Sequence, residues 1–306
     1  MKYLKLIRYK NLLLIALMQS LFHFGFLKFQ TNFLALNTWQ FVLLILATLC
    51  IAAGGYIIND IEDQYSDSIN KPERQTVGKT IDENFAFYLY MGLTIVGVGI
   101  GYYLSTVIGK NSFVACFIIT GMLLYMYSTS LKKIPVLGNI IIASILSFSI
   151  LIIGFFDIFP ATYGENYSSQ MYLFSVLIDF AAFAFIINFI REMVKDVEDV
   201  NGDYNANINT LPVLIGTART LKVIMAISFI AIVVFLYYIA INFVNSNLIL
   251  GYSLFFILGP LVFFFIKLLN AKNKKDYTFL SNILKVVMLF GILAIGVIQL
   301  NFIYNV

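Results

Sequence analysis

Hydrophobic runs dominate the chain and alternate with short polar stretches. Nine runs are long enough to cross a bilayer as helices, because about 20 apolar residues span its hydrocarbon core. Each run therefore predicts one membrane-spanning helix, and polar positions gather in the connections. We place the spans near residues 10–27, 39–58, 84–104, 111–128, 138–156, 170–190, 220–243, 247–268 and 279–302.

The composition agrees with an integral membrane protein. Hydrophobic residues make up 60% of the 306 residues, charged residues only 12%, and the mean hydropathy is +0.89. This length could hold two soluble domains, but the composition favours one all-α bundle of nine transmembrane helices, with residues 1–306 as a single domain. Cys50 and Cys116 lie inside apolar runs, where no spacing suggests a disulfide or a zinc site.

The basic residues predict the orientation of the helices. If the N-terminus lies in the cytoplasm, 18 of the 20 Lys and Arg residues fall on the cytoplasmic side, and only Lys28 and Lys110 do not. The positive-inside rule therefore predicts an N-terminus inside. We expect the membrane to be the inner (plasma) membrane. The basic segment Met1–Lys10 is not followed by a small-residue cleavage site, so we expect the first helix to be retained.

One acidic pattern, Asp-x-Glu-Asp-x-x-x-Asp, occurs twice, at residues 60–67 and 196–203. Each copy follows a hydrophobic run, and both are predicted at the cytoplasmic ends of their spans. Taken as a helix, the three Asp residues of each copy fall within an arc of about 60°. They are Asp60, Asp63 and Asp67 in the first copy and Asp196, Asp199 and Asp203 in the second, with Asn59 widening the first arc.

Ordinary solvated loops are the simplest reading of acidic runs, but three observations favour a cation site. The pattern is repeated, 12 of the 16 acidic residues fall within 60–83 and 192–203, and negative charge at helix C-termini opposes the helix dipole. Mg²⁺ suits such oxygen donors and leaves coordination positions for phosphate and water. The lack of His and Cys near both motifs argues against zinc and copper.

Basic residues accompany both motifs. They follow the first motif, close the fourth span and precede the second motif. Most of them can be explained as topology signals. Carboxylates, Mg²⁺ and cations at one pole are nevertheless what an organic diphosphate requires, and an apolar cavity behind them would suit an isoprenoid tail. The basic residues concerned are Lys71, Arg74, Lys132, Lys133, Arg191 and Lys195.

These residues resemble the signatures of the UbiA superfamily of intramembrane prenyltransferases. The first signature is Asn59-Asp60-x-x-Asp63-x-x-x-Asp67-x-x-Asn70-x-Pro72-x-Arg74, and the second runs from Lys195 to Asp203 with Thr210-Leu211-Pro212 and Gly216 after it. Tyr127-Ser128, Leu131-Lys132, Arg8 and Asn11 resemble two further family patches. Gln75 departs from the pattern, because many members have Pro there.

The resemblance implies Mg²⁺-dependent transfer of a polyprenyl group from its diphosphate to a lipophilic acceptor. Two Mg²⁺ ions per site are expected, within membrane lipid, with no nucleic acid and no obligate protein partner. Metal ligands are then expected at Asn59, Asp60, Asp63, Asp67, Asp196, Asp199 and Asp203. Catalytic roles are expected for Asp63, Asp67, Asp199, Asp203, Tyr127 and Lys132. Substrate contacts are expected from Asn11, Asn59, Lys71, Arg74, Lys132 and Lys195.

The acceptor is predicted from the amino-acid sequence of the second motif. Residues 191–203 look most like the branch that makes digeranylgeranylglyceryl phosphate, so geranylgeranylglyceryl phosphate is the preferred acceptor. Prenylation of 4-hydroxybenzoate, homogentisate or a naphthoate in quinone biosynthesis is the alternative, since such enzymes have a similar motif. A cation transporter is a remote alternative. Transporters place ionisable residues near the bilayer midplane, whereas the acidic motifs here are predicted at the ends of their spans.

Two further polar residues lie inside apolar runs. His23 lies on the far side of the first span from the motifs, and no chemistry is expected of it. Asp179 lies in the middle of the sixth span. Intramembrane carboxylates usually face a cavity or a partner, so one hypothesis is that Asp179 lines the pocket.

Overall fold

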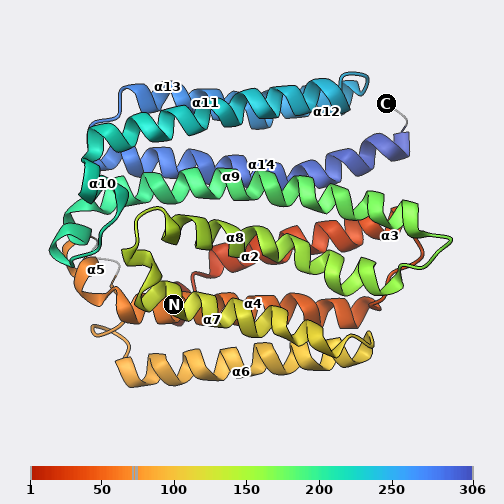
Figure 1. Cartoon of the computed structure of the whole chain (residues 1–306), viewed down its shortest axis with the longest axis horizontal. Coiled ribbons are helices and arrows are strands. Elements are labelled where there is room, and N and C mark those ends of the chain that lie inside the picture. Colours follow the sequence, from red (N-terminus) through yellow and green to blue (C-terminus); the bar gives the residue numbers. More distant parts are fainter. Residues whose placement is uncertain (1, 71, 73–74, 305–306) are drawn as a thin grey trace.

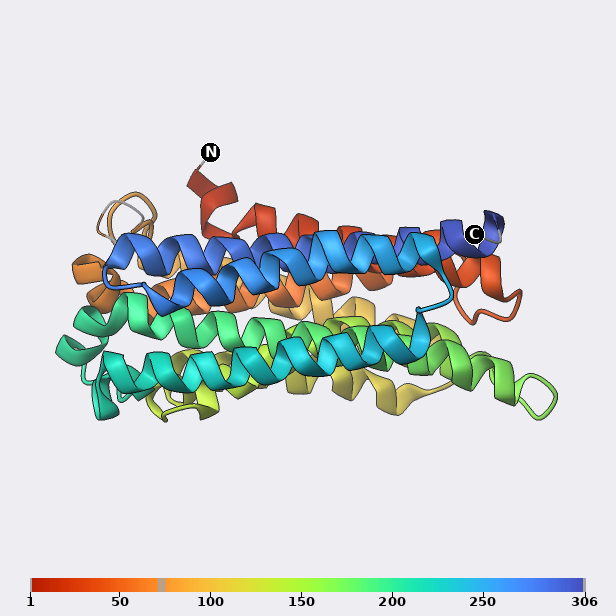
Figure 2. The same cartoon turned by 90° about the horizontal axis from the view of Figure 1, so that it is seen from above.

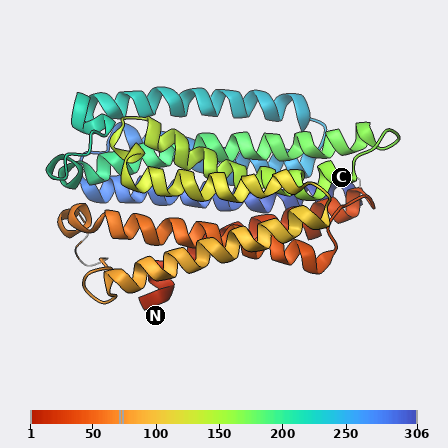
Figure 3. The ribbon, with the colours of Figure 1, turned by 60° about the horizontal axis from the view of Figure 1, so that its bottom comes forward.

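The computed structural model describes residues 2–70, 72 and 75–304. Long helices lie side by side along one axis, and α6 (Glu83–Val107) and α11 (Thr217–Asn242) lie at opposite edges of the bundle (Figures 1 and 3). The described residues form helices and loops, with one isolated β-bridge between Val77 and Ile81. The prediction of an all-α bundle is confirmed.

Nine helical segments in the described residues are long and apolar enough to cross a membrane, as predicted. Five of them are single helices: α4 (Thr38–Glu62), α6, α9 (Tyr167–Asn205), α11 and α14 (Lys274–Tyr304). The other four are composite: α2 (Tyr9–Ser20) with η1 (Leu21–Leu27) and α3 (Lys28–Gln30), η2 (Asn111–Phe113) with α7 (Val114–Thr129), α8 (Leu137–Ile153) with η4 (Gly154–Ile158) and η5 (Phe159–Ala161), and α12 (Asn247–Tyr252) with η6 (Ser253–Leu258) and α13 (Gly259–Leu269).

Four short helices complete the fold: α1 (Lys2–Leu6), α5 (Gln64–Asn70), η3 (Leu131–Lys133) and α10 (Leu211–Ile215). The first of these, α1, projects from the side of the bundle (Figure 2). α5 and α10 lie at one end of the bundle, and the loop before α9 lies at the other (Figure 1). We call the end that carries α5 and α10 the acidic pole, since both Asp-rich motifs lie there.

The sixth span is much longer than predicted. Its helix, α9, has 39 residues and continues without a break through the second acidic motif. Met193, Val194 and Val197 are buried in the core, so apolar packing maintains the helix where the chain becomes charged. α9 also connects the two largest of the three apolar clusters in the described residues, because its first half packs in one and its second half in the other.

The sequence predicted the first acidic motif on one helix, but the structure divides it between two. α4 ends at Glu62, and α5 begins at Gln64. Asp63 stands between them with φ −91° and ψ 4°, outside regular helical geometry. The hydrogen bonds Asp63 N to Asn59 O (2.9 Å) and Asp67 N to Asp63 O (2.8 Å) nevertheless cross the junction, so the two helices follow closely on one another.

A buried His–Asp contact lies in the half of the bundle away from the acidic pole. His23 in η1 and Asp157 in η4 are both fully buried, and Nδ1 lies 2.6 Å from Oδ2. Asp157 also accepts hydrogen bonds from Leu36 N (3.0 Å, side chain) and Ala35 N (2.9 Å, backbone). The imidazole stacks on Phe41 at 3.7 Å. The pair therefore joins two π-helical segments and the first loop, and the sequence analysis had overlooked Asp157.

Asp179 does not line the pocket, so that hypothesis is wrong. Its side chain is exposed on the outer face of α9, where it accepts a hydrogen bond of 2.9 Å from the Tyr238 hydroxyl of α11. Asp179 is absent from the residues that line the large cavity described below. The hydrogen bond instead links α9 to α11.

Candidate active site

A cavity of about 1120 Å³ opens at the acidic pole and continues into the bundle. Its mouth is polar, because both acidic motifs and several basic side chains line it. Further in, the wall is apolar and aromatic, with Phe117, Phe148, Phe180 and Phe183 among its side chains. The structure thus brings together two motifs that are more than 100 residues apart in the sequence.

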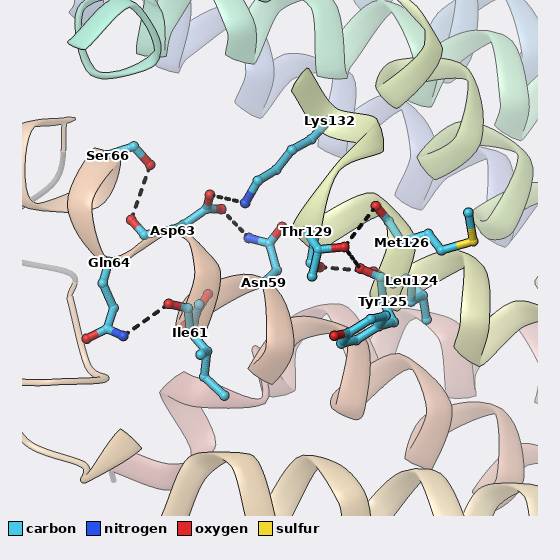
Figure 4. Close-up of polar contacts among 12 residues, drawn as sticks. Asn59, Ile61, Asp63, Gln64, Ser66, Leu124, Tyr125, Met126, Thr129 and Lys132 are labelled. Atoms are coloured by element: carbon cyan, nitrogen blue, oxygen red, sulfur yellow. Dashed lines mark hydrogen bonds and ion pairs between the residues drawn. The ribbon is translucent and has the colours of Figure 1, made fainter. Parts of the chain in front are cut away.

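Asp63 is the centre of the contacts in the first motif (Figure 4). Lys132 Nζ from η3 lies 2.5 Å from its Oδ1, and Asn59 Nδ2 donates to its Oδ2 at 2.5 Å. The Lys132 side chain is 10% exposed and that of Asp63 19%, so the ion pair is largely shielded from water. Lys132 thus lies beside a carboxylate of the first motif, and its expected contact with phosphate stays a prediction.

Arg8 pairs with Asp60, another carboxylate of the first motif. Its guanidinium donates to Asp60 Oδ1 at 2.7 Å and lies 5.0 Å from the centre of the Tyr56 ring. Burial opposes its charged form, but Asp60 raises the pKa of the guanidinium above its ordinary value, so Arg8 stays charged. Its backbone is left-handed (φ 49°, ψ 52°), an unusual conformation that joins α1 to α2. Asn11 lines the cavity and donates to the Tyr56 hydroxyl at 3.4 Å.

Two carboxylates of the second motif accept hydrogen bonds from residues outside α9. Asp196 Oδ2 accepts a hydrogen bond from Asn139 Nδ2 of α8 at 2.8 Å. Asp203 is buried and accepts from the Thr210 hydroxyl at 3.2 Å. Asp67 and Asp199 line the same cavity. Asn139 was missed in the sequence analysis, and its only signal was a polar side chain at the start of an apolar run.

Asn70 connects the two motifs directly. Its Nδ2 donates to the Asp199 carbonyl at 2.9 Å, and its Oδ1 accepts from Gly202 N at 3.0 Å. A Cβ at position 202 would collide with the Asn70 side chain, so only glycine fits there. α5 is thereby held against α9, which explains why an Asn and a Gly accompany the Asp residues in the two signatures.

Further cations lie on α9. Glu192 is buried and pairs with Lys195 Nζ at 2.7 Å and with Arg191 at 3.0 Å. Both cations line the cavity, as does Tyr127, which faces the carboxylates of Glu192, Asp63 and Asp196. The predicted substrate residues Lys71 and Arg74 lie outside the described residues.

The donor chemistry of the mouth fits Mg²⁺. All seven predicted metal ligands line the cavity and present only carboxylate or amide groups, which are hard donors that suit this ion. Within residues 2–70, 72 and 75–304, no three acidic, His or Cys side chains are already gathered as a metal cluster. Asp60, Asp63 and Asp196 instead contact Arg8, Lys132 and Asn139, respectively.

A model of the UbiA prenyltransferase family matches residues 29–290. The chain therefore belongs to this family, which confirms the resemblance drawn from the two Asp-rich signatures. With nine apolar helices among its described residues, it is a multi-pass membrane protein.

Curated relatives indicate the branch of the family. The chain is similar to the digeranylgeranylglyceryl phosphate synthases of Sulfolobus acidocaldarius (36% identity over 60% of this chain and 62% of the relative) and Methanopyrus kandleri (32% over 56% and 57%). The corresponding enzyme of Saccharolobus solfataricus is 32% identical over 72% of this chain and 71% of its own length. The chain thus spans about three-fifths of the length of the first two relatives.

Solved structures share the fold. A structure of digeranylgeranylglyceryl phosphate synthase is 24% identical, with a TM-score of 0.61 over 97% of this chain and 98% of the other. A UbiA homolog from Archaeoglobus fulgidus bound to GPP and Mg²⁺ is 18% identical, with a TM-score of 0.62 over 97% and 100%. These similarities extend over 97% of the chain and show a shared fold.

Proposed function

We propose that this protein transfers a polyprenyl group from a prenyl diphosphate to a lipophilic acceptor. The observation that carries the proposal is the single cavity, which has two Asp-rich motifs and basic side chains at its mouth and an aromatic interior. A diphosphate fits the charged mouth, and an isoprenoid chain fits the apolar interior. The similar structure from Archaeoglobus fulgidus, bound to GPP and Mg²⁺, supports this assignment.

The carboxylates have two kinds of role in this proposal. Asp63, Asp67, Asp199 and Asp203, with Asn59, would hold two Mg²⁺ ions, which neutralise charge on the diphosphate when bound. Asp60 and Asp196 contact Arg8 and Asn139 in the structure, so they support the site by positioning these groups as well as by supplying oxygen donors.

The remaining residues favour ionisation of the allylic C–O bond. Lys132, at the mouth, stabilises the charge that develops on the departing diphosphate. The ring of Tyr127 and the aromatic wall stabilise an allylic cation through their π faces, and the apolar cavity excludes water that would capture it. The described part of the mouth holds no His, so a carboxylate or the departing diphosphate accepts the proton of the acceptor.

We propose geranylgeranylglyceryl phosphate as the acceptor, on the strength of the second motif and of relatives named for that reaction. Purified protein with Mg²⁺ and geranylgeranyl diphosphate is expected to prenylate this lipid, and mass spectrometry identifies the product. Parallel reactions contain 4-hydroxybenzoate, homogentisate or dihydroxynaphthoate. A prenylated aromatic product without the glyceryl lipid would replace the ether-lipid proposal with the quinone-type alternative.

We further propose that the acidic pole faces the cytoplasm, with the N-terminus inside and the protein in the plasma membrane. Exposed positions at the two ends test this orientation: Ser68 and Asn205 near the acidic pole, and Glu165 at the other end. In a background without Cys50 and Cys116, Ser68→Cys and Asn205→Cys are expected to react with an impermeant thiol reagent only from the cytoplasmic side. Glu165→Cys is expected to react only from outside, and the reverse pattern would contradict the proposed orientation.

A further inference from the structure

A second group of cations lies in the cavity, beginning at Lys195, the first residue of the second signature, and extending away from its Asp residues. It consists of Arg191 and Lys195 on α9 and Lys285 on α14, with Asn188 beside them on α9. At 100° per residue, Asn188, Arg191 and Lys195 fall within an arc of about 60°. Asp196 is turned about 140° and Asp199 about 80° away from Arg191, and Asp199 lies about two helical turns nearer the acidic pole, so depth along α9 is what mainly separates Arg191 from the second motif.

Lys285 is the least expected member of the group. It lies 11 residues after the start of α14, about 16 Å along the helix, although its charge resembled a topology signal in the sequence. Arg191 and Lys195 act on it most strongly among the charged groups, followed by Arg8 and Lys10, and all four are like charges. Among the described residues, no hydrogen bond or ion pair engages Lys285. A lysine at such a depth usually serves a ligand or a partner.

The neighbouring side chains also present hydrogen-bond donors without acceptors. Asn188 is 2% exposed, and its Nδ2 is buried without a hydrogen-bond partner in the described part of the chain. The same holds for Nε of Arg191, whose Nη1 is held by Glu192. Buried donors almost always have an acceptor, so their grouping beside Lys285 indicates an anionic ligand.

Charge and depth indicate what kind of anion fits. Arg191, Lys195 and Lys285 carry three formal positive charges and Glu192 one negative charge, which leaves a balance that matches a phosphate monoester dianion. Arg191 follows the predicted apolar part of α9, residues 170–190, and so lies at the level of lipid headgroups. It is eight residues, or about 12 Å, deeper along α9 than Asp199.

We propose that Arg191, Lys285 and Asn188 form a separate, metal-independent site for the phosphate monoester of the lipid acceptor. This inference rests on the proposed function, because it assigns the headgroup of geranylgeranylglyceryl phosphate to this group and the prenyl diphosphate to the Asp-rich motifs. The acceptor hydroxyl would then approach the allylic carbon from the Lys285 side of the cavity. Neutral acceptors lack the charge that this site binds.

Steady-state kinetics of Lys285→Gln tests the site. The KM for geranylgeranylglyceryl phosphate is expected to rise at least about tenfold, because a charge-assisted hydrogen bond is lost, while the KM for geranylgeranyl diphosphate stays within about twofold. Lys285→Arg should restore most of the lost affinity. Lys275→Gln is the matched control, since Lys275 is an exposed lysine of the same helix outside the cavity.

A binding measurement without Mg²⁺ keeps the test independent of turnover and of folding. Wild-type protein is expected to bind geranylgeranylglyceryl phosphate more tightly than geranylgeranylglycerol, which lacks the phosphate. Lys285→Gln and Asn188→Ala should reduce this preference, with melting curves that confirm folded protein. If wild-type protein uses the lipid phosphate but the Lys285→Gln KM is unchanged, or if the KM for the diphosphate rises instead, the inference is wrong. If wild-type protein neither binds nor prenylates the lipid phosphate, the proposed acceptor is wrong as well.

Discussion

Asp63→Asn and Asp199→Asn are each expected to lower the rate of prenyl transfer by at least about 10³-fold, equivalent to about 4 kcal/mol of transition-state stabilisation. Both side chains line the mouth of the cavity, one in each acidic motif. Asn keeps the shape of Asp and can still accept from Lys132 or Asn59, but it loses the charge that attracts Mg²⁺. The rate is measured with saturating substrates over a range of Mg²⁺ concentrations.

Glu62→Gln is the matched control for these two variants. Glu62 lies next to Asp63 in the sequence, but its side chain is exposed and does not line the cavity. We expect this variant to keep near wild-type activity, and all three proteins should melt within a few degrees of the wild type. Full activity of both Asp variants would contradict the two-motif mechanism, whatever the acceptor.

Asp157→Ala is expected to destabilise the protein by about 1–3 kcal/mol for each of the two buried groups that it leaves without a partner, the His23 ring and Leu36 N. The loss should appear as a lower melting temperature in detergent. The KM values of the folded enzyme should stay near those of the wild type, since neither member of the pair lines the cavity.

The double variant His23→Leu/Asp157→Leu separates the contribution of the His23–Asp157 contact from that of the hydrogen bond to Leu36 N. Replacing both partners with apolar side chains removes the unpaired buried group, so part of the stability should return. Recovery should remain incomplete, because Leu36 N still lacks its acceptor. Glu165→Ala, an exposed acidic position in the same half of the bundle, is expected to change the melting temperature little.

The number of spans and the location of the motifs could be predicted from local sequence. Each hydrophobic run is about the length of a membrane crossing, and each motif is a compact set of charges at the end of a run. Both features depend only on residues that are close in the sequence. They can therefore be predicted without knowledge of how the helices pack.

The long-range contacts could not be predicted in this way. The partner of His23 is 134 positions away, and Asn70 binds backbone groups 129 and 132 positions away. The predicted end of the sixth span was also too early. Mean hydropathy falls where the charged residues of α9 begin, although one face of the helix stays apolar. Lys285 was assigned to the basic residues around a loop, because the sequence shows its charge but not its position in the cavity.

The length of α9 has a consequence for how the two products leave. At 39 residues it measures about 58 Å, whereas the hydrocarbon layer is about 30 Å thick. The helix therefore carries Asp199 and Asp203 well beyond the apolar stretch, to a level that water reaches. In the proposed reaction, inorganic diphosphate would be released at this level, whereas the apolar wall of the cavity would keep the isoprenoid product at the level of the hydrocarbon layer. Each product of that reaction would then form beside the medium that dissolves it.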